Sequence, residues 1–178
     1  MKTILCILMW LLLAPFDLLV NLLAFPLAPV IVLLTTQAGV SPLWCWPWLT
    51  DDNPIDGDAG HLERWPDNGT RWRVYSRRVA WLWRNRGYGF STRITGVQLS
   101  GATRFWGDRK VSDNPMHAGW CIAINGRAWE LYAFYPWLSI LRRGLRIRIG
   151  WAIPLTIDQP AETAMLKTHV NPFKGYTL

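Results

Sequence analysis

The first part of the chain is an almost unbroken apolar run. Polar side chains are rare from residue 4 to residue 34, although Pro15, Asp17, Pro26 and Pro29 interrupt the run. A helix needs about 20 apolar residues to cross a bilayer core, and this run is longer. It therefore predicts a membrane anchor, either one span kinked at Pro15 or a hairpin that turns near Pro26 and Pro29. A cleaved secretory signal is the alternative, but no small-x-small cleavage site follows the first apolar block, and hydrophobicity resumes after Asp17.

Two polar side chains lie inside this run. Asp17 and Asn21 are four positions apart, so a helix places both on one face. A polar group against lipid is costly unless it has a polar partner. The spacing predicts an intramembrane polar pair, which could form the seam of a homo-oligomer. In the alternative, Pro15 breaks the helix and Asp17 caps a second helix near the membrane interface.

Alternating tryptophans follow the apolar run. Trp44, Trp46 and Trp48 occupy every second position just beyond it. Indole rings combine an apolar body with a polar N–H and are best accommodated at the headgroup level, which predicts an interfacial belt. A short strand whose three tryptophans face a protein core explains the same alternation.

A helical period appears between residues 70 and 85, and the glycines at 87 and 89 end it. On a helical wheel the apolar side comprises Trp72, Tyr75, Val79, Leu82 and Trp83, and the cationic side comprises Arg73, Arg77, Arg78 and Arg84. Trp81 falls on the cationic side, where we expect it to contact lipid, another subunit or a different part of the chain. Such a helix can lie in a membrane interface, with arginines on lipid phosphates. The alternative is a helix packed on a sheet with its arginines in water.

The charge of the chain favours an anionic partner. Its 178 residues carry a net charge of +7, and residues 64–110 hold eleven basic side chains against two acidic ones. Interleaved arginine and tryptophan also suit nucleic acid, but an anchored chain meets lipid headgroups at far higher local concentration, so we expect anionic lipid to be the partner. The predicted membrane-interface residues are Trp44, Trp46, Trp48, Trp72, Arg73, Arg77, Arg78, Trp81, Trp83 and Arg84.

Downstream the period changes from helical to alternating. Asn125-Gly126 suits a two-residue hairpin that pairs residue 124 with 127, 122 with 129 and 120 with 131. Residues 145–153 alternate as a strand that buries its aliphatic side chains and turns Arg146 and Arg148 outward. Weaker strands are predicted at residues 94–99 and 103–106.

These patterns together predict an α+β protein. An N-terminal hydrophobic membrane anchor precedes an amphipathic helix and a small antiparallel sheet. The predicted organisation is an anchor over residues 1–42, a Trp/Arg-rich domain over residues 43–155 and a loosely held tail over residues 156–178.

Sequence patterns of catalysis and metal binding are weak. Cys6, Cys45 and Cys121 have no paired spacing. Residues 52–63 resemble a calcium loop, but Pro54 occupies a ligand position and breaks the motif. A hydrolytic site around Asp56, Asp58 and His61, or one that pairs His117 with Asp113, rests on single side chains. We therefore expect no catalytic residue, no cofactor and no bound metal, and a protein that is not an enzyme.

Residues 81–90, the upstream segment 52–58 and the strand 145–151 together resemble small uncharacterised proteins of tailed bacteriophages and prophages, over roughly residues 43–153. The resemblance implies a phage origin and a bacterial host, and it carries over no catalytic residue. We expect an accessory protein at the host inner membrane, with its larger domain in the cytoplasm. It would bind an envelope component, for example in superinfection exclusion. A virion or lysis component, with a virion protein as its partner, is the alternative.

Overall fold

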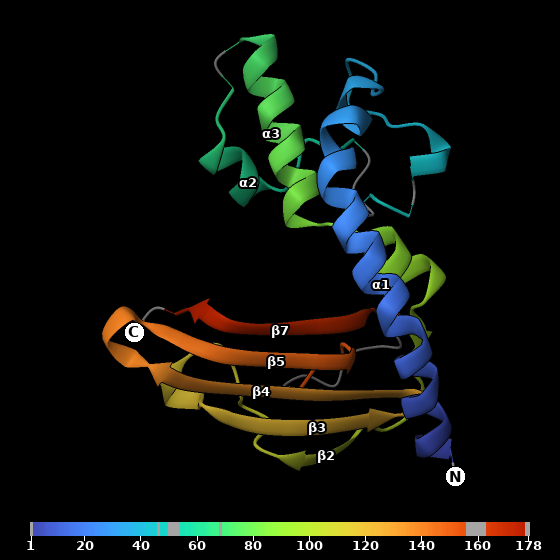
Figure 1. Cartoon of the computed structure of the whole chain (residues 1–178), viewed down its shortest axis with the longest axis vertical. Helices are drawn as coiled ribbons and strands as arrows, with labels where there is room; N and C mark the ends of the chain where they lie inside the picture. Colours follow the sequence, from blue (N-terminus) through green and yellow to red (C-terminus); the bar gives the residue numbers. More distant parts are fainter. Residues whose placement is uncertain (1, 46, 50–53, 68, 156–162, 177–178) are drawn as a thin grey trace. The chain divides into compact units, whose positions relative to one another are not determined.

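The computed structural model describes residues 2–45, 47–49, 54–67, 69–155 and 163–176. The chain forms two compact units, one of Met1–Pro15 with Thr95–Leu178 and the other of Phe16–Ile94. The predicted α+β class is confirmed: a long apolar helix is followed by further helices and by small antiparallel sheets (Figure 1). The units meet in sequence at residues 15/16 and 94/95, whereas the sequence predicted boundaries at 42/43 and 155/156.

The apolar run forms one continuous helix, α1 (Lys2–Leu33). The hairpin is therefore wrong, and so is a helix that breaks at Pro15. A proline in a helix interior costs roughly 3 kcal/mol. Packing against α1 within each unit offsets that cost, with Met9, Trp10 and Leu13 on the core of the first unit.

The second unit packs short helices and turns on the C-terminal part of α1. Its elements are η1 (Leu43–Cys45), α2 (Ala59–Arg64), α3 (Arg71–Arg84) and the π-helical turn η2 (Phe90–Ile94). The predicted amphipathic helix is confirmed as α3. The Thr70 hydroxyl caps its first turn by accepting a hydrogen bond from the Arg73 amide at 3.3 Å, and Asn85 ends the helix. The core of this unit joins α1, α3 and the intervening turns through Ala28, Ile31, Val32, Cys45, Leu49, Ile55, Val79, Trp81 and Leu82.

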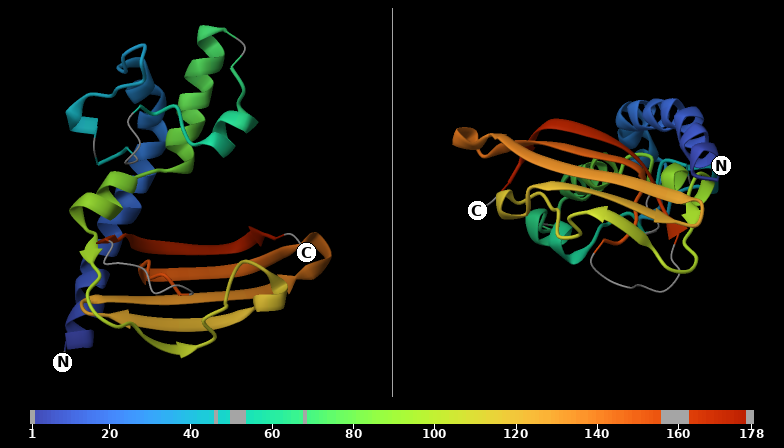
Figure 2. Two further views of the ribbon diagram at one scale, coloured as in Figure 1. Left: turned by 180° about the vertical axis from the view of Figure 1, so that it is seen from behind. Right: turned by 90° about the horizontal axis from the view of Figure 1, so that it is seen from below.

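The first unit is built on a five-stranded antiparallel sheet (Figures 1 and 2). In spatial order its strands are β2 (Arg104–Gly107), β3 (Gly119–Asn125), β4 (Ala128–Leu138), β5 (Arg143–Trp151) and β7 (Leu166–Gly175). A separate pair joins β1 (Val97–Gln98) to β6 (Thr163–Ala164). Two strands therefore lie in the predicted loose tail, which is wrong for residues 163–175, because β7 pairs with β5 along almost its whole length.

The β3–β4 hairpin exists, but its pairing differs from the prediction by two residues. Asn125 pairs with Ala128, which leaves Gly126 and Arg127 as the turn. Gly126 has φ 56°, as the first turn residue of a type II′ hairpin requires. Asn125 stays in the strand because its side chain accepts a hydrogen bond from the Ser100 amide and donates to Gly101 and Thr103.

The sheet buries the face opposite to the one that the alternation predicted. Its covered face carries Cys121, Ala123, Ala128, Glu130 and Phe134, and Leu99, Val111, Ile153 and Leu155 belong to the same core. Figure 2 shows the segment between β2 and β3 crossing this side of the sheet. Most of the predicted face is half-buried or exposed, including Trp120, Ile122, Ile124, Leu131, Ile147 and Ile149. The predicted burial is confirmed at Trp151 and Ile153.

Candidate membrane interface

The arrangement of side chains around α1 is the reverse of a soluble helix. Within Phe16–Leu33 the buried positions are Asp17, Ala24, Ala28, Ile31 and Val32, and the first three of these are polar or small. The exposed positions of the same stretch are large and apolar: Phe16, Leu18, Leu19, Leu22, Leu23, Phe25, Val30 and Leu33. A water-soluble helix turns its large apolar side chains toward the protein. Small residues toward protein and large apolar ones outward are the pattern of a helix in lipid.

The first fifteen residues have the same exposed apolar side, although the larger Met9, Trp10 and Leu13 also pack on protein. Cys6 and Ala14 are buried, whereas Ile4, Leu5, Leu8, Leu11 and Leu12 are exposed. Trp10 lies on the protein side, where its ring meets Trp129 edge-on with ring centres 5.6 Å apart and its indole nitrogen donates to the Lys167 carbonyl at 3.0 Å. Residues 4–33 form the one helix among the described residues that is long and apolar enough to cross a membrane.

The polar pair within α1 is satisfied inside the second unit. Asp17 is 2% exposed and accepts a hydrogen bond from the Ser91 hydroxyl at 2.7 Å. The Asn21 side chain donates to the Asp17 carbonyl at 2.8 Å. Asp17 thus has a polar partner in η2 of its own chain, so it needs no oligomer seam to satisfy it. The sequence analysis did not identify Ser91, which lies in the short polar segment Ser91-Thr92-Arg93 and belongs to no recognised motif.

Two predicted interface arginines instead hold the second unit together. Arg77 donates to one Asp56 carboxylate oxygen at 2.8 Å, and Arg78 donates to the same oxygen at 2.9 Å. Arg78 also donates to the Thr36 and Gln37 carbonyls, which fastens the segment after α1 to α3. Burial raises the pKa of Asp56, but the hydrogen bonds and charges of Arg78 and Arg77 outweigh it and hold that pKa below its ordinary value.

Trp81 and His61 are also internal. Trp81 is buried in the core of the unit, and its ring centre lies 5.1 Å from that of His61. The assignment of Arg77, Arg78 and Trp81 to a lipid surface is therefore wrong, because Asp56 from the preceding turn and His61 from α2 cover that side of α3. The alternative that Trp81 contacts a different part of the chain is correct. A helical wheel of α3 alone contains no information about this cover.

The remaining predicted aromatic residues are distributed between surface and core. Trp83 is exposed beside α1, where it stacks on Phe25 at 4.9 Å and donates to the Phe25 carbonyl at 2.9 Å. Trp72 is exposed and stacks on Tyr75. Trp44 is exposed within η1, so the alternative of a strand is wrong at this position. Trp48 is half-buried against the core. Trp46 lies outside the described residues.

Arg73 and Arg84 line the outer side of α3. Arg73 lies over the Trp65 ring and donates to the Pro66 carbonyl, which shields much of its side chain. Arg84 is exposed and forms an ion pair with Asp58 at 3.3 Å. These two arginines and the exposed Trp72 and Trp83 remain candidates for contact with a headgroup layer.

The acidic turn performs structural roles. The Asp58 carboxylate caps α2 by accepting from the His61 amide at 2.7 Å, and this hydrogen bond is the largest cause of the lowered pKa of Asp58. His61 is buried with its Nε2 atom 2.9 Å from the Arg77 carbonyl oxygen. The structure thus engages Asp56 and Asp58 in ion pairs and capping, and the His61 side chain in a hydrogen bond with the backbone. The described residues contain no group of three metal-ligating side chains, and Asp52 lies outside them.

A second polar network occupies the covered face of the sheet. Glu130 is 0% exposed, forms an ion pair with Arg148 and accepts from the Ile153 amide at 2.5 Å. Arg146 and Arg148 therefore do not face water as the alternation predicted, because buried or half-buried carboxylates on the same face pair with them. The sequence signal was present but weak: Glu130 is the one acidic residue of β4.

Asp113 completes this network from the segment before β3. Its carboxylate forms ion pairs with Arg146 at 3.0 Å and with Lys174 at 3.4 Å, and it accepts a hydrogen bond from the Tyr132 hydroxyl at 3.0 Å. Burial, and then the charge and hydrogen bond of Asp113, raise the pKa of Tyr132 to about 12, so its hydroxyl stays a neutral donor. His117 is exposed and is not among these partners.

Comparison with known proteins gives a family without a described activity. No curated protein matches the chain, and no solved structure matches it. One family model, described as a family of unknown function, matches all of residues 1–178. The chain therefore belongs to the DUF7338 family.

Proposed function

We propose that this chain is a membrane-anchored, non-enzymatic protein that acts by binding at a bacterial inner membrane. The supporting observation is the arrangement of α1, whose protein side carries Asp17, Ala24 and Ala28 before Ile31 and Val32, and whose open side carries leucine and phenylalanine. Fully burying one leucine is worth about 1.5–3 kcal/mol. The exposed leucines of α1 are thus a large unsatisfied apolar surface in water and a favourable one in lipid.

The contacts within each unit favour a helix embedded by one side over a helix surrounded by lipid. Trp10 is held by the sheet in one unit, and Ile31 and Val32 are held by the α3 core in the other. Protein therefore covers part of the circumference of α1 in both units. The open apolar side is left for the acyl chains.

A binding role is preferred to catalysis because the polar groups are already engaged. Asp56, Glu130 and Asp113 each hold arginine in structural ion pairs. A catalytic acid or base must be able to reach the substrate. Each of these three carboxylates is instead paired with an arginine of its own chain. Phage origin, superinfection exclusion and a cytoplasmic larger domain stay predictions of the sequence.

Fractionation of cells that express the full chain tests the proposal. We expect the protein in the membrane fraction, resistant to alkaline carbonate and with residues 1–33 still attached. A variant with asparagine at Leu12 and Leu22 should shift to the soluble fraction, because it places amides on the open side of α1. Asparagine at Leu62 and Met116, which are exposed outside α1, is the matched control. Recovery of the unsubstituted chain as soluble protein with a processed N-terminus contradicts the proposal.

A further inference from the structure

The β4–β5 connection is an exposed apolar tip on a charged end of the sheet. Ile140 is 93% exposed and Leu141 is 64% exposed, and both lie in the helical turn η4 (Ser139–Leu141). Figure 1 shows this turn at the end of the sheet opposite to the β3–β4 hairpin. A soluble protein gains nothing from two adjacent aliphatic side chains in water at a loop tip.

Aromatic side chains flank the tip. Trp137 and Phe173 are exposed at the ends of β4 and β7, with ring centres 5.8 Å apart. The indole nitrogen of Trp137 donates to the Pro172 carbonyl at 2.7 Å, which fixes the ring beside the tip. An amphipathic indole ring just behind an aliphatic tip is the order of side chains found across a membrane interface.

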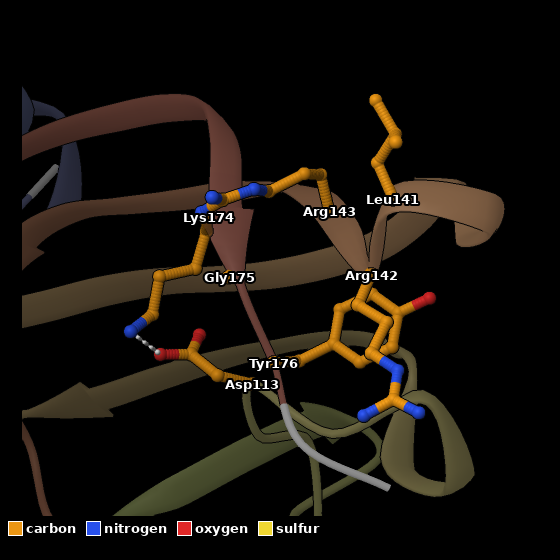
Figure 3. Close-up of a pocket in the computed structure, with 7 residues that line it drawn as sticks. All are labelled: Asp113, Leu141, Arg142, Arg143, Lys174, Gly175 and Tyr176. Carbon is orange, nitrogen blue, oxygen red and sulfur yellow. Dashed lines mark ion pairs between the residues drawn. The ribbon is translucent and has the colours of Figure 1, made fainter.

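A cationic pocket of about 550 Å³ lies directly behind the tip (Figure 3). Its lining includes Arg142, Arg143 and Lys174, together with Asp113 and Tyr176. Lys174 and Arg146 share the single carboxylate of Asp113, so the pocket keeps an excess of positive charge. No salt bridge in the described part of the chain joins Arg142 or Arg143 to a carboxylate. Figure 3 shows Leu141 pointing away from the other lining side chains.

The backbone conformation at Arg142 determines how the tip presents its aliphatic and arginine side chains. Arg142 has φ 51° and ψ 47°, the left-handed conformation, and it is the one non-glycine residue of the described chain with positive φ. Its amide donates to the Ser139 carbonyl at 3.0 Å, and its carbonyl accepts from the Tyr176 amide. A non-glycine residue keeps this conformation only where its surroundings determine it. The turn therefore holds the aliphatic pair and the arginine pair on a rigid support.

We infer that the tip of unit 1 is a second membrane contact, in which Ile140 and Leu141 enter an anionic bilayer and the pocket formed by Arg142, Arg143 and Lys174 receives lipid phosphates. Charge complementarity selects this occupant, because an apolar protein partner would not need three cations behind the apolar pair. Each cation near an anionic surface strengthens binding about fivefold. This inference rests on the proposed membrane location, and it adds a lipid class and a second site.

A fluorescent reporter in the full chain tests the inference. Ile140→Cys is labelled with an environment-sensitive dye, and the unsubstituted chain serves as the blank because Cys6, Cys45 and Cys121 are buried. The labelled chain is reconstituted in vesicles of phosphatidylcholine alone or of equal parts phosphatidylcholine and phosphatidylglycerol, each with and without nitroxide-labelled lipid. We expect nitroxide lipid to quench the dye severalfold more in the anionic vesicles.

Charge substitutions then separate the tip from the anchor. R142Q/R143Q/K174Q should abolish the anionic-lipid dependence at residue 140, whereas R104Q/R127Q, at exposed arginines elsewhere in the unit, should leave it intact. A second reporter at Leu22→Cys follows α1. Quenching at residue 22 without quenching at residue 140 overturns the tip contact and leaves the anchor standing. A dye shift at residue 140 that depends on protein concentration without lipid indicates a second copy as the occupant and also overturns it.

Discussion

The Ser91 hydroxyl donates to the buried carboxylate of Asp17 at 2.7 Å, across 74 positions of sequence. This hydrogen bond joins the apolar helix α1 to η2 inside one unit. It also explains how an acidic residue can occur in a helix whose opposite side is suited to lipid. Asp17 faces protein, and the exposed apolar side of α1 carries no charged side chain between residues 4 and 33.

Loss of that hydroxyl should weaken the second unit. Ser91→Ala leaves a buried carboxylate without one of its donors, and a hydrogen bond to a charged group is worth about 1.5–3 kcal/mol. We expect the free energy of unfolding in detergent to fall by about that amount. Ser76→Ala, which removes a hydroxyl with an exposed hydrogen bond to Trp72, should change it by less than about 0.5 kcal/mol. Equal effects of both substitutions would contradict a structural role for Ser91.

Removing the Asp56 carboxylate should be more damaging. Asp56→Asn leaves the guanidinium groups of Arg77 and Arg78 buried without their counter-charge, and breaking a buried pair in this way typically costs about 3–5 kcal/mol. Asp67→Asn is the matched control, because the Asp67 carboxylate lies 3.9 Å from Arg77 and is largely exposed. Chemical denaturation with tryptophan fluorescence measures both, since Trp81 is in the affected core. A neutral effect at Asp56 would show that the two arginines find other partners.

The Asp56 carboxylate also makes the stability of the folded chain depend on pH in the acid range. Its pKa in the folded chain lies below the ordinary value, so the folded state binds this proton less readily than the unfolded state. The contribution is therefore present at neutral pH and is lost as pH falls from the unfolded pKa of about 3.9 toward the lower folded value. We expect unfolding free energy to drop over this acid range and the Asp56→Asn chain to lack part of that drop. If the unfolding free energies of the two chains fall equally over this pH range, the role given to the Asp56 carboxylate is contradicted.

Glu130 should be the corresponding residue of the sheet. Glu130→Ala leaves the Ile153 amide without its side-chain acceptor and removes the partner of Arg148, so we expect a loss of about 3 kcal/mol. Glu130→Gln keeps an acceptor and should lose less. Hydrogen exchange of the β4 and β5 amides reports the change locally. Unchanged exchange in the alanine variant would contradict this role.

Local patterns in the sequence predicted the elements, whereas the partners of polar side chains depended on tertiary contacts. The helical period between residues 70 and 85 and the glycines at 87 and 89 were enough to locate α3. The sheet was correctly expected to be antiparallel, but alternating side chains do not say which face is covered. Arg146 and Arg148 looked like a solvent face until Asp113 and Glu130, from other segments, were found against them.

The residues predicted for the membrane interface show the same difference between local pattern and tertiary contact. Exposure of Trp44, Trp72 and Trp83 follows the sequence expectation, but the cover over Arg77, Arg78 and Trp81 comes from a turn about twenty residues earlier in the chain. The tip at Ile140 was missed because two aliphatic residues before an arginine pair look like the end of one strand and the start of the next. Only the exposed turn between β4 and β5 distinguishes it.

A cysteine scan along α1 tests the membrane anchor most directly. A dye is attached at Leu12, Leu19 and Leu22 on the open side, and at Ala24 and Ala28 on the protein side, in separate full-length chains reconstituted in vesicles. The account predicts strong quenching by nitroxide lipid at the three leucine positions and weak quenching at the two alanine positions. Quenching of the leucine positions by a water-soluble quencher, with none by nitroxide lipid, would contradict the anchor.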